Sequence, residues 1–141
     1  MGRTEMDDEI RSKAKKLARG YVENYTFVSD MEKIRPSIIS RIGVDTDGWL
    51  PAGYRLPDMK MLPKDRRLAE EYIQRRREKE IVDIAVDGRL SGKCREVVSD
   101  SFRCRMKGDK IMEKYGICRN TVTNMRKKGL KAVAEEMILQ G

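Results

Sequence analysis

Residues 108–128, GDKIMEKYGICRNTVTNMRKK, decide how the C-terminal part of this chain folds, because they carry the pattern of two short helices joined by a tight turn. Gly116 stands where the turn requires a residue that tolerates a positive φ, and Ile117 follows it as an apolar plug between the helices. Within each helix, apolar residues three or four positions apart provide a shared core: Ile111, Tyr115, Val122 and Met125. The stretch therefore predicts a helix-turn-helix whose second helix spans residues 119–138.

The second helix of this motif is polar and basic outside its core positions. From residue 119 to residue 131 the chain has five basic side chains and no acidic one. Arg and Asn can form paired hydrogen bonds with base edges in the major groove, whereas Lys, Arg and Thr hold phosphates. We therefore predict that eight residues contact double-stranded DNA: Arg119, Asn120, Thr121, Thr123, Asn124, Arg126, Lys127 and Lys128. The alternative, a helix with a solvated basic face, does not explain the turn glycine and the plug.

The last third of the chain also resembles a known family. Residues 90–137, LSGKCREVVSDSFRCRMKGDKIMEKYGICRNTVTNMRKKGLKAVAEEM, are similar to region four of bacterial sigma factors and to the phage late-gene activators that share its fold. Five short segments carry the resemblance: Arg95-Glu96-Val97, Ile111, Gly116-Ile117, Asn120-Thr121-Val122 and Gly129-Leu130-Lys131. The resemblance implies a transcription regulator of phage or prophage origin, with RNA polymerase as a candidate partner.

Two residues depart from the family pattern. Met112 stands where the family has alanine at the contact between the helices, and Cys118 stands where it has a serine N-cap. By analogy with cap-to-alanine changes, the poorer cysteine cap costs about 0.5 to 2 kcal/mol of helix stability. We expect the motif to form despite that cost.

Charge composition supports a polyanionic partner. The 141 residues include 31 Lys and Arg against 23 Asp and Glu, a net charge of +8. Residues 91–141 hold twelve basic and six acidic side chains, so this part of the chain contributes +6 of the +8. There is no apolar run near the ~20 residues of a membrane span, and the N-terminus lacks the apolar core of a signal peptide. We expect a cytoplasmic protein that does not contact membranes.

Residue usage argues against an enzyme and against a metal site. The chain has no histidine, which removes the commonest general base and the usual partner of a Ser or Cys nucleophile. Its three cysteines, Cys94, Cys104 and Cys118, form no CxxC pair, so we expect neither zinc nor a disulfide framework. Phosphate-binding glycine loops are absent. We expect no catalytic residues, no metal ligands and no cofactor.

The N-terminal part of the chain predicts long helices. Residues 8–41 have a seven-residue repeat of Ile10, Leu17, Asn24, Met31 and Ile38, with Ala14, Tyr21 and Val28 beside it, and predict one long helix. The stripe could form a homodimer or pack on its own chain, and both interpretations stay open. Pro36 could kink this helix or begin a second, short one.

The middle of the chain predicts a connector followed by a second long helix. Residues 43–63 contain three glycines and three of the four prolines, so we expect an ordered connector that covers the helices or contacts a partner. A helix is predicted for residues 64–87, with an exposed charged stretch at 75–80 and an end at Gly88. The first helix of the sigma-like part is predicted at residues 93–106.

Taken together, these patterns predict an all-α protein with long N-terminal helices and a C-terminal helix-turn-helix domain. Residues 1–88 would form a helical arm for dimerisation or partner contact, and residues 89–141 the DNA-binding domain. The leading interpretation is a sequence-specific, DNA-binding transcription regulator. Two alternatives remain: a DNA-packaging or replication adaptor that uses the same motif, and a protein-interaction module that contacts RNA polymerase.

Overall fold

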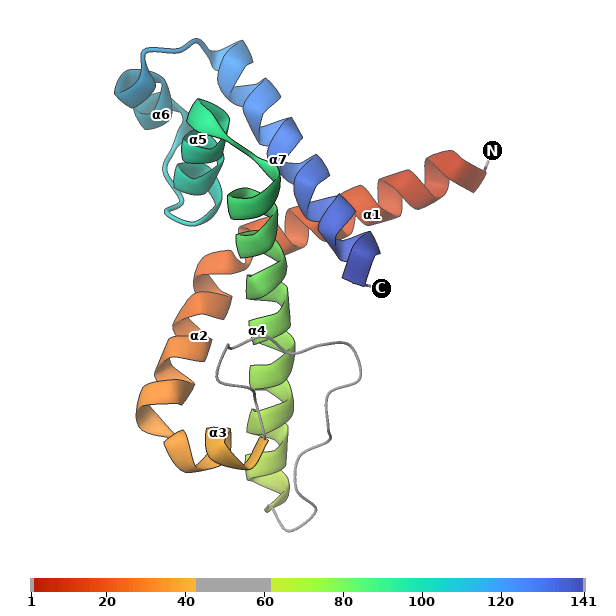
Figure 1. Ribbon diagram of the computed structural model, residues 1–141, viewed down its shortest axis with the longest axis vertical. Helices are drawn as coiled ribbons and strands as arrows, with labels where there is room; N and C mark the ends of the chain where they lie inside the picture. Colours follow the sequence, from red (N-terminus) through yellow and green to blue (C-terminus); the bar gives the residue numbers. More distant parts are fainter. Residues whose placement is uncertain (1, 43–61, 141) are drawn as a thin grey trace. The chain divides into compact units, whose positions relative to one another are not determined.

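The computed structural model describes residues 2–42 and 62–140, with side chains described for residues 8–40 and 62–140. The described residues form helices and no strand, which confirms the all-α class. The helices are α1 (Gly2–Arg19), α2 (Tyr21–Ile34), α3 (Pro36–Ile42), α4 (Pro63–Arg89), α5 (Gly92–Phe102), α6 (Gly108–Tyr115) and α7 (Arg119–Gln140), as Figure 1 shows. Almost all of the connector expected at 43–63 lies outside the described residues.

The prediction of one helix over residues 8–41 is wrong. Gly20 separates α1 from α2, and its N–H still donates to the carbonyl of Lys16 at 2.9 Å. Arg35 separates α2 from α3, and Pro36 begins α3, where its missing N–H costs no helical hydrogen bond. The apolar repeat continues across both breaks because the residues on either side still face inward. A seven-residue count therefore did not reveal the break at Gly20.

The chain divides into two compact units, one of residues 1–22 and 81–141 and the other of residues 23–80. This division does not coincide with the predicted boundary after residue 88, because α1 and the end of α4 belong with the C-terminal helices. The apolar repeat is divided in the same way. Ala14 and Tyr21 are buried in the first unit, whereas Val28, Met31 and Ile38 are buried in the second.

In the unit of residues 23–80, α2 and α3 pack on the first part of α4. The buried core is Val28, Met31, Ile38, Ala69, Tyr72 and Ile73. Asn24, the polar member of the repeat, is also buried, and its Nδ2 donates to Glu78 Oε2 at 3.2 Å. Most residues of the apolar repeat therefore pack against other residues of the same chain. This agrees with the intramolecular interpretation.

The charged stretch of α4 at residues 75–80 is half-buried, so the prediction that it is exposed is wrong. The Arg75 guanidinium lies 4.8 Å from the centroid of the Phe27 ring. Arg76 Nη1 donates to the Tyr72 hydroxyl at 2.6 Å, and that hydroxyl donates to Glu32 Oε1 at 2.8 Å. The long side chains of this stretch lie along apolar surface instead of extending into solvent.

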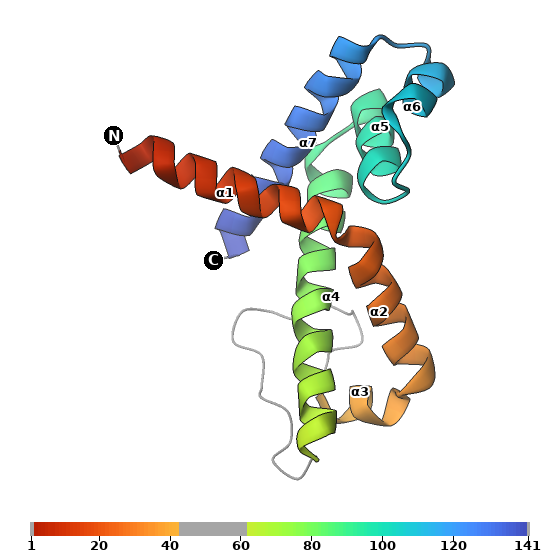
Figure 2. The same ribbon diagram turned by 180° about the vertical axis from the view of Figure 1, so that it is seen from behind.

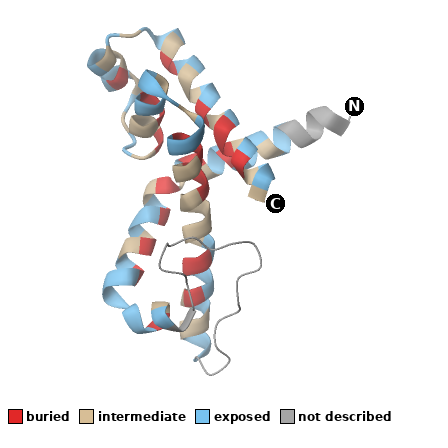
Figure 3. Ribbon diagram, in the orientation of Figure 1, coloured by how far each residue is buried: buried red, intermediate tan, exposed pale blue. Residues whose placement is uncertain are grey.

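In the other unit, α1, α5, α7 and the end of α4 share one core (Figures 2 and 3). Its buried residues are Ala14, Ala18, Tyr21, Ile81, Val82, Ala85, Val86, Val98, Phe102, Ala132 and Val133. Two predicted ends differ: α4 continues through Gly88 to Arg89, and α5 ends at Phe102, so Met106 lies in the segment that leads to α6.

Candidate nucleic-acid interface

The segment that joins α6 to α7 is built around Gly116. This residue has φ 62° and ψ 40°, the left-handed conformation that glycine adopts without steric cost, so the predicted turn is confirmed. The N–H of Ile117 donates to the carbonyl of Met112 at 3.2 Å, which satisfies a carbonyl at the end of α6. The Cys118 carbonyl accepts a hydrogen bond from the N–H of Val122 at 3.1 Å. Helix α7 begins at Arg119, the residue after Cys118.

A separate small core holds α6 and α7 at this turn. Val97, Ile111 and Val122 are buried, and five partly buried side chains pack around them: Met106, Met112, Tyr115, Ile117 and Met125. All four core residues predicted from their spacing are therefore in this cluster. Val97 comes from α5, so three helices fix the direction in which α7 leaves the turn.

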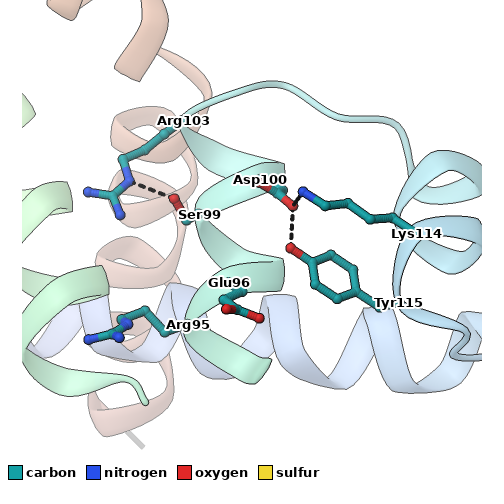
Figure 4. Close-up of a pocket in the computed structure, with 7 residues that line it drawn as sticks. All are labelled: Arg95, Glu96, Ser99, Asp100, Arg103, Lys114 and Tyr115. Atoms are coloured by element: carbon teal, nitrogen blue, oxygen red, sulfur yellow. Dashed lines mark hydrogen bonds and ion pairs between the residues drawn. The ribbon is translucent and has the colours of Figure 1, made fainter. Parts of the chain in front are cut away.

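A polar contact between α5 and α6 reinforces this arrangement, and the sequence analysis missed it (Figure 4). Asp100 accepts hydrogen bonds from Lys114 Nζ, at 2.9 Å, and from the Tyr115 hydroxyl. Burial acts to raise the pKa of Asp100, but the hydrogen bonds from Lys114 and Tyr115 outweigh it, and the pKa is lowered. The carboxylate therefore stays charged and holds α6 against α5.

These side chains line a shallow pocket of about 360 Å³. Arg95, Glu96, Ser99 and Arg103 complete its wall (Figure 4). Arg103 turns away to the carboxylates of Asp83 and Asp87, with nitrogen-to-oxygen distances of 3.0 and 2.8 Å. Because Asp100 and Arg103 are satisfied by neighbours in the chain, we assign this pocket a structural role.

The eight predicted DNA-contact residues all lie in α7, but their environments differ. Six are exposed: Arg119, Asn120, Thr123, Asn124, Lys127 and Lys128. Thr121 is half-buried, and its Oγ1 lies 3.2 Å from Cys118 Sγ. Arg126 is also half-buried, and its Nε donates to Ser101 Oγ of α5 at 2.9 Å. Thr121 and Arg126 therefore have structural partners within the chain.

Cys118 occupies the position before the first turn of α7. Its pKa is lowered, first by the hydrogen bond with the Thr121 side chain and then by the backbone N–H groups of Thr121 and Asn120. A helix N-terminus favours the thiolate in the same way that it favours other anions. The sulfur therefore lies at the start of α7, where its closest described partner is the Thr121 hydroxyl.

The exposed face of α7 agrees with the one expected from the spacing of Val122 and Met125, except at Arg126. With Val122 buried and Arg126 turned to α5, a row of exposed positions at helical spacing is formed by Asn120, Asn124, Lys127 and Lys131. Arg119 and Thr123 flank this row at its N-terminal end. Arg126, which the spacing placed on the outer face, lies beside the row and packs near Gly108, where an added Cβ would be 3.8 Å from Arg126 Nη2.

In a comparison with known proteins, no family model, no curated protein and no solved structure matches the chain. None of the helices among the described residues combines the length and the apolar composition that crossing a membrane requires.

Proposed function

We propose that this protein is a double-stranded DNA-binding transcription regulator of the phage or prophage type. In this proposal α6 and α7 form a helix-turn-helix, and the N-terminal turns of α7 enter the major groove. One observation carries the proposal: the first three turns of α7 expose Asn and basic side chains, while the opposite side of the same turns is fixed in a three-helix core. A recognition helix needs such a rigid support, because its side chains must be held in position against the bases.

The roles follow from position on the helix. Arg119, Asn120, Thr123 and Asn124 are exposed on the first two turns, where side chains reach base edges. Lys127 and Lys128, one turn further on, are exposed cations suited to phosphates. Arg126 acts through its hydrogen bond to Ser101, which fixes α7 on α5.

The experiment that tests the proposal is selection of bound duplexes from a random DNA pool, followed by affinity measurements with Asn124→Ala. We expect a consensus site, and we expect the substitution to relax preference at one or two positions, at about 1 to 3 kcal/mol per bidentate pair removed. Affinity for unrelated DNA should change little, because a base contact contributes nothing there.

Lys93→Ala, an exposed cation at the start of α5, is the matched control and should leave the consensus unchanged. If no sequence is enriched, the regulator proposal fails. If Asn124→Ala weakens binding to all sequences equally, α7 lies on the phosphate backbone and the major-groove assignment fails. Sedimentation of the DNA complex separates a regulator from a packaging adaptor, since an adaptor assembles many subunits into a ring.

A further inference from the structure

A groove of about 660 Å³ runs between α1 and α7, both in the unit of residues 1–22 and 81–141. Figures 1 and 2 show α1 crossing the C-terminal half of α7. Four of the nine lining residues are apolar: Ile10 from α1 and Leu130, Ala134 and Ile138 from α7. Ile138 is 62% exposed, so its side chain is accessible from the groove.

Cations border the apolar lining on both sides. Arg11 and Lys15 come from α1, Lys127 and Lys131 come from α7, and all four side chains are exposed. Among the residues whose side chains are described, none of the four has an ion-pair partner. Glu135 is the acidic member of the lining, and it pairs with Arg89 of α4 at 3.2 Å. The groove thus combines four exposed cations that have no ion-pair partner among the described side chains with four apolar residues, which we call its floor.

We infer that this groove binds an acidic, amphipathic helix of a partner protein. The apolar floor would receive the helix's apolar stripe, and the four cations would face acidic side chains along its edges. A phosphate backbone would use the cations alone and would leave Ile10, Leu130 and Ile138 without a function. A second copy of this chain is a poor occupant, because each copy carries a net charge of +8.

The inference does not rest on the proposed DNA contact, since neither Arg11, Lys15 nor Ile138 belongs to that surface. The two surfaces share Lys127. An acidic helix in the groove would neutralise Lys127, which is one of the eight predicted DNA-contact residues, and would compete with DNA for it. Partner binding would then weaken DNA binding, and DNA would weaken partner binding by the same factor.

The test uses the full chain and a fluorescein-labelled peptide of roughly 18 residues, five helical turns, with Leu at i, i+3, i+4 and i+7 and Glu elsewhere. Fluorescence anisotropy should report saturable binding. A peptide of the same composition, with its Leu residues spread around the helix, should bind at least about tenfold more weakly. Equal binding of the two peptides would overturn the inference, because charge alone would then explain the interaction.

Charge reversal locates the site. Arg11→Glu with Lys15→Glu should weaken peptide binding by about tenfold or more, because like charges would then face the peptide. The matched control reverses Lys13 and Lys16, which lie on α1 outside the groove and change the net charge equally. Peptide affinity that fell equally in both variants would contradict the assigned site. Circular dichroism checks that each variant folds.

Floor contact is tested by Ile138→Asn, a substitution at an exposed position that should weaken the peptide without unfolding the protein. In methyl NMR spectra, the peptide should shift Ile10 and Ile138 and leave buried Ile111 and Ile73 unmoved. If the Arg11 and Lys15 reversal instead lowers duplex affinity and leaves the peptide unaffected, the groove is a phosphate surface and the inference is overturned. The base-reading test with Asn124→Ala is separate from these measurements.

Discussion

At the residue scale, Cys118 stands directly before α7 and contacts the first turn of that helix. Its sulfur lies 3.2 Å from Thr121 Oγ1, and its carbonyl accepts the first hydrogen bond of α7. Sulfur is a weak acceptor as a thiol and a stronger one as a thiolate. The contact with the Thr121 side chain is the largest cause of the lowered pKa of Cys118.

Thr121→Val should raise the pKa of Cys118. The substitution removes the side-chain hydrogen bond, the largest cause of the lowered pKa, and keeps the backbone N–H groups of residues 120 and 121. The shift should therefore be upward but partial. The rate of iodoacetamide alkylation at Cys118, followed by peptide mass spectrometry across pH, measures it. Thr123→Val, at an exposed position one turn away from the cap, should leave the profile unchanged.

At the element scale, α7 combines two tasks along its length. Its first turns hold the exposed Asn and basic row, and its second half packs against α5 and α1. Gly129 lies at the middle of α7 and is buried. A Cβ at this position would lie 2.7 Å from Val98 Cγ1 and 3.1 Å from Phe102 Cε2. Helices α5 and α7 can therefore approach this closely because residue 129 has no side chain.

Gly129→Ala should therefore destabilise the protein, although alanine is the better helix former. The helix propensity gain is about 1 kcal/mol, whereas overpacking a rigid core costs typically about 1 to 3 kcal/mol. Val98 is fully buried and β-branched, so it cannot move aside easily. Urea unfolding measures the change. In Gly88→Ala, where nothing lies within 4 Å of the new Cβ, the stability should stay the same or rise.

The exposed cations of α7 lead to a second prediction at this scale. Lys127→Ala with Lys128→Ala should reduce the slope of log affinity against log salt by up to about 1.8, which is about 0.9 for each phosphate that a lysine no longer neutralises. Binding assays from about 50 to about 200 mM salt measure this slope. Arg126→Ala should change it less, because its guanidinium is engaged with Ser101. An unchanged slope in the double variant would exclude both lysines from the interface.

At the scale of the whole molecule, Arg103 joins distant parts of the unit of residues 1–22 and 81–141. It pairs with Asp83 and Asp87 of α4, and its Nε donates to Ser99 Oγ of α5 at 3.0 Å. The hydroxyl of Tyr21 donates to the same Asp83 oxygen at 2.8 Å. The hydrogen bond from Arg103 lowers the pKa of Asp87.

Arg103→Met should lower the free energy of unfolding at neutral pH. It should also make that free energy less dependent on pH in the acidic range. The folded pKa of Asp87 is below the unfolded value of about 3.9, so its stabilisation is present above that value and is lost as pH falls through the folded pKa. Urea unfolding at about pH 7 and about pH 3 should show the variant and the wild type converging in acid. In Arg103→Met, a further Asp87→Asn change should have a smaller effect than in the wild type. Independent, additive effects would contradict the pairing.

Local features were predictable wherever short-range chemistry decides them. The turn at Gly116 follows from the need for a left-handed residue, the core of Ile111, Tyr115, Val122 and Met125 from helical spacing, and α4 from its apolar side. Pro36 indicated either a kink or the start of a short helix, because proline has no N–H to donate, and the structure has the second outcome, α3. These features are determined by the sequence itself, since neighbours within a few residues are enough to specify them.

Only the tertiary structure decided which helices share a core and which side chains remain free. The apolar repeat of the N-terminal helices could serve a dimer or its own chain, and packing assigned most of it to two cores of one chain. Arg126 had the spacing of an outer-face residue, but Ser101, 25 positions away in sequence, holds it on α5. The groove likewise exists because α1 packs against α7. Such contacts join residues far apart in the chain, and the periodicity of one helix states which face is apolar but not what covers it.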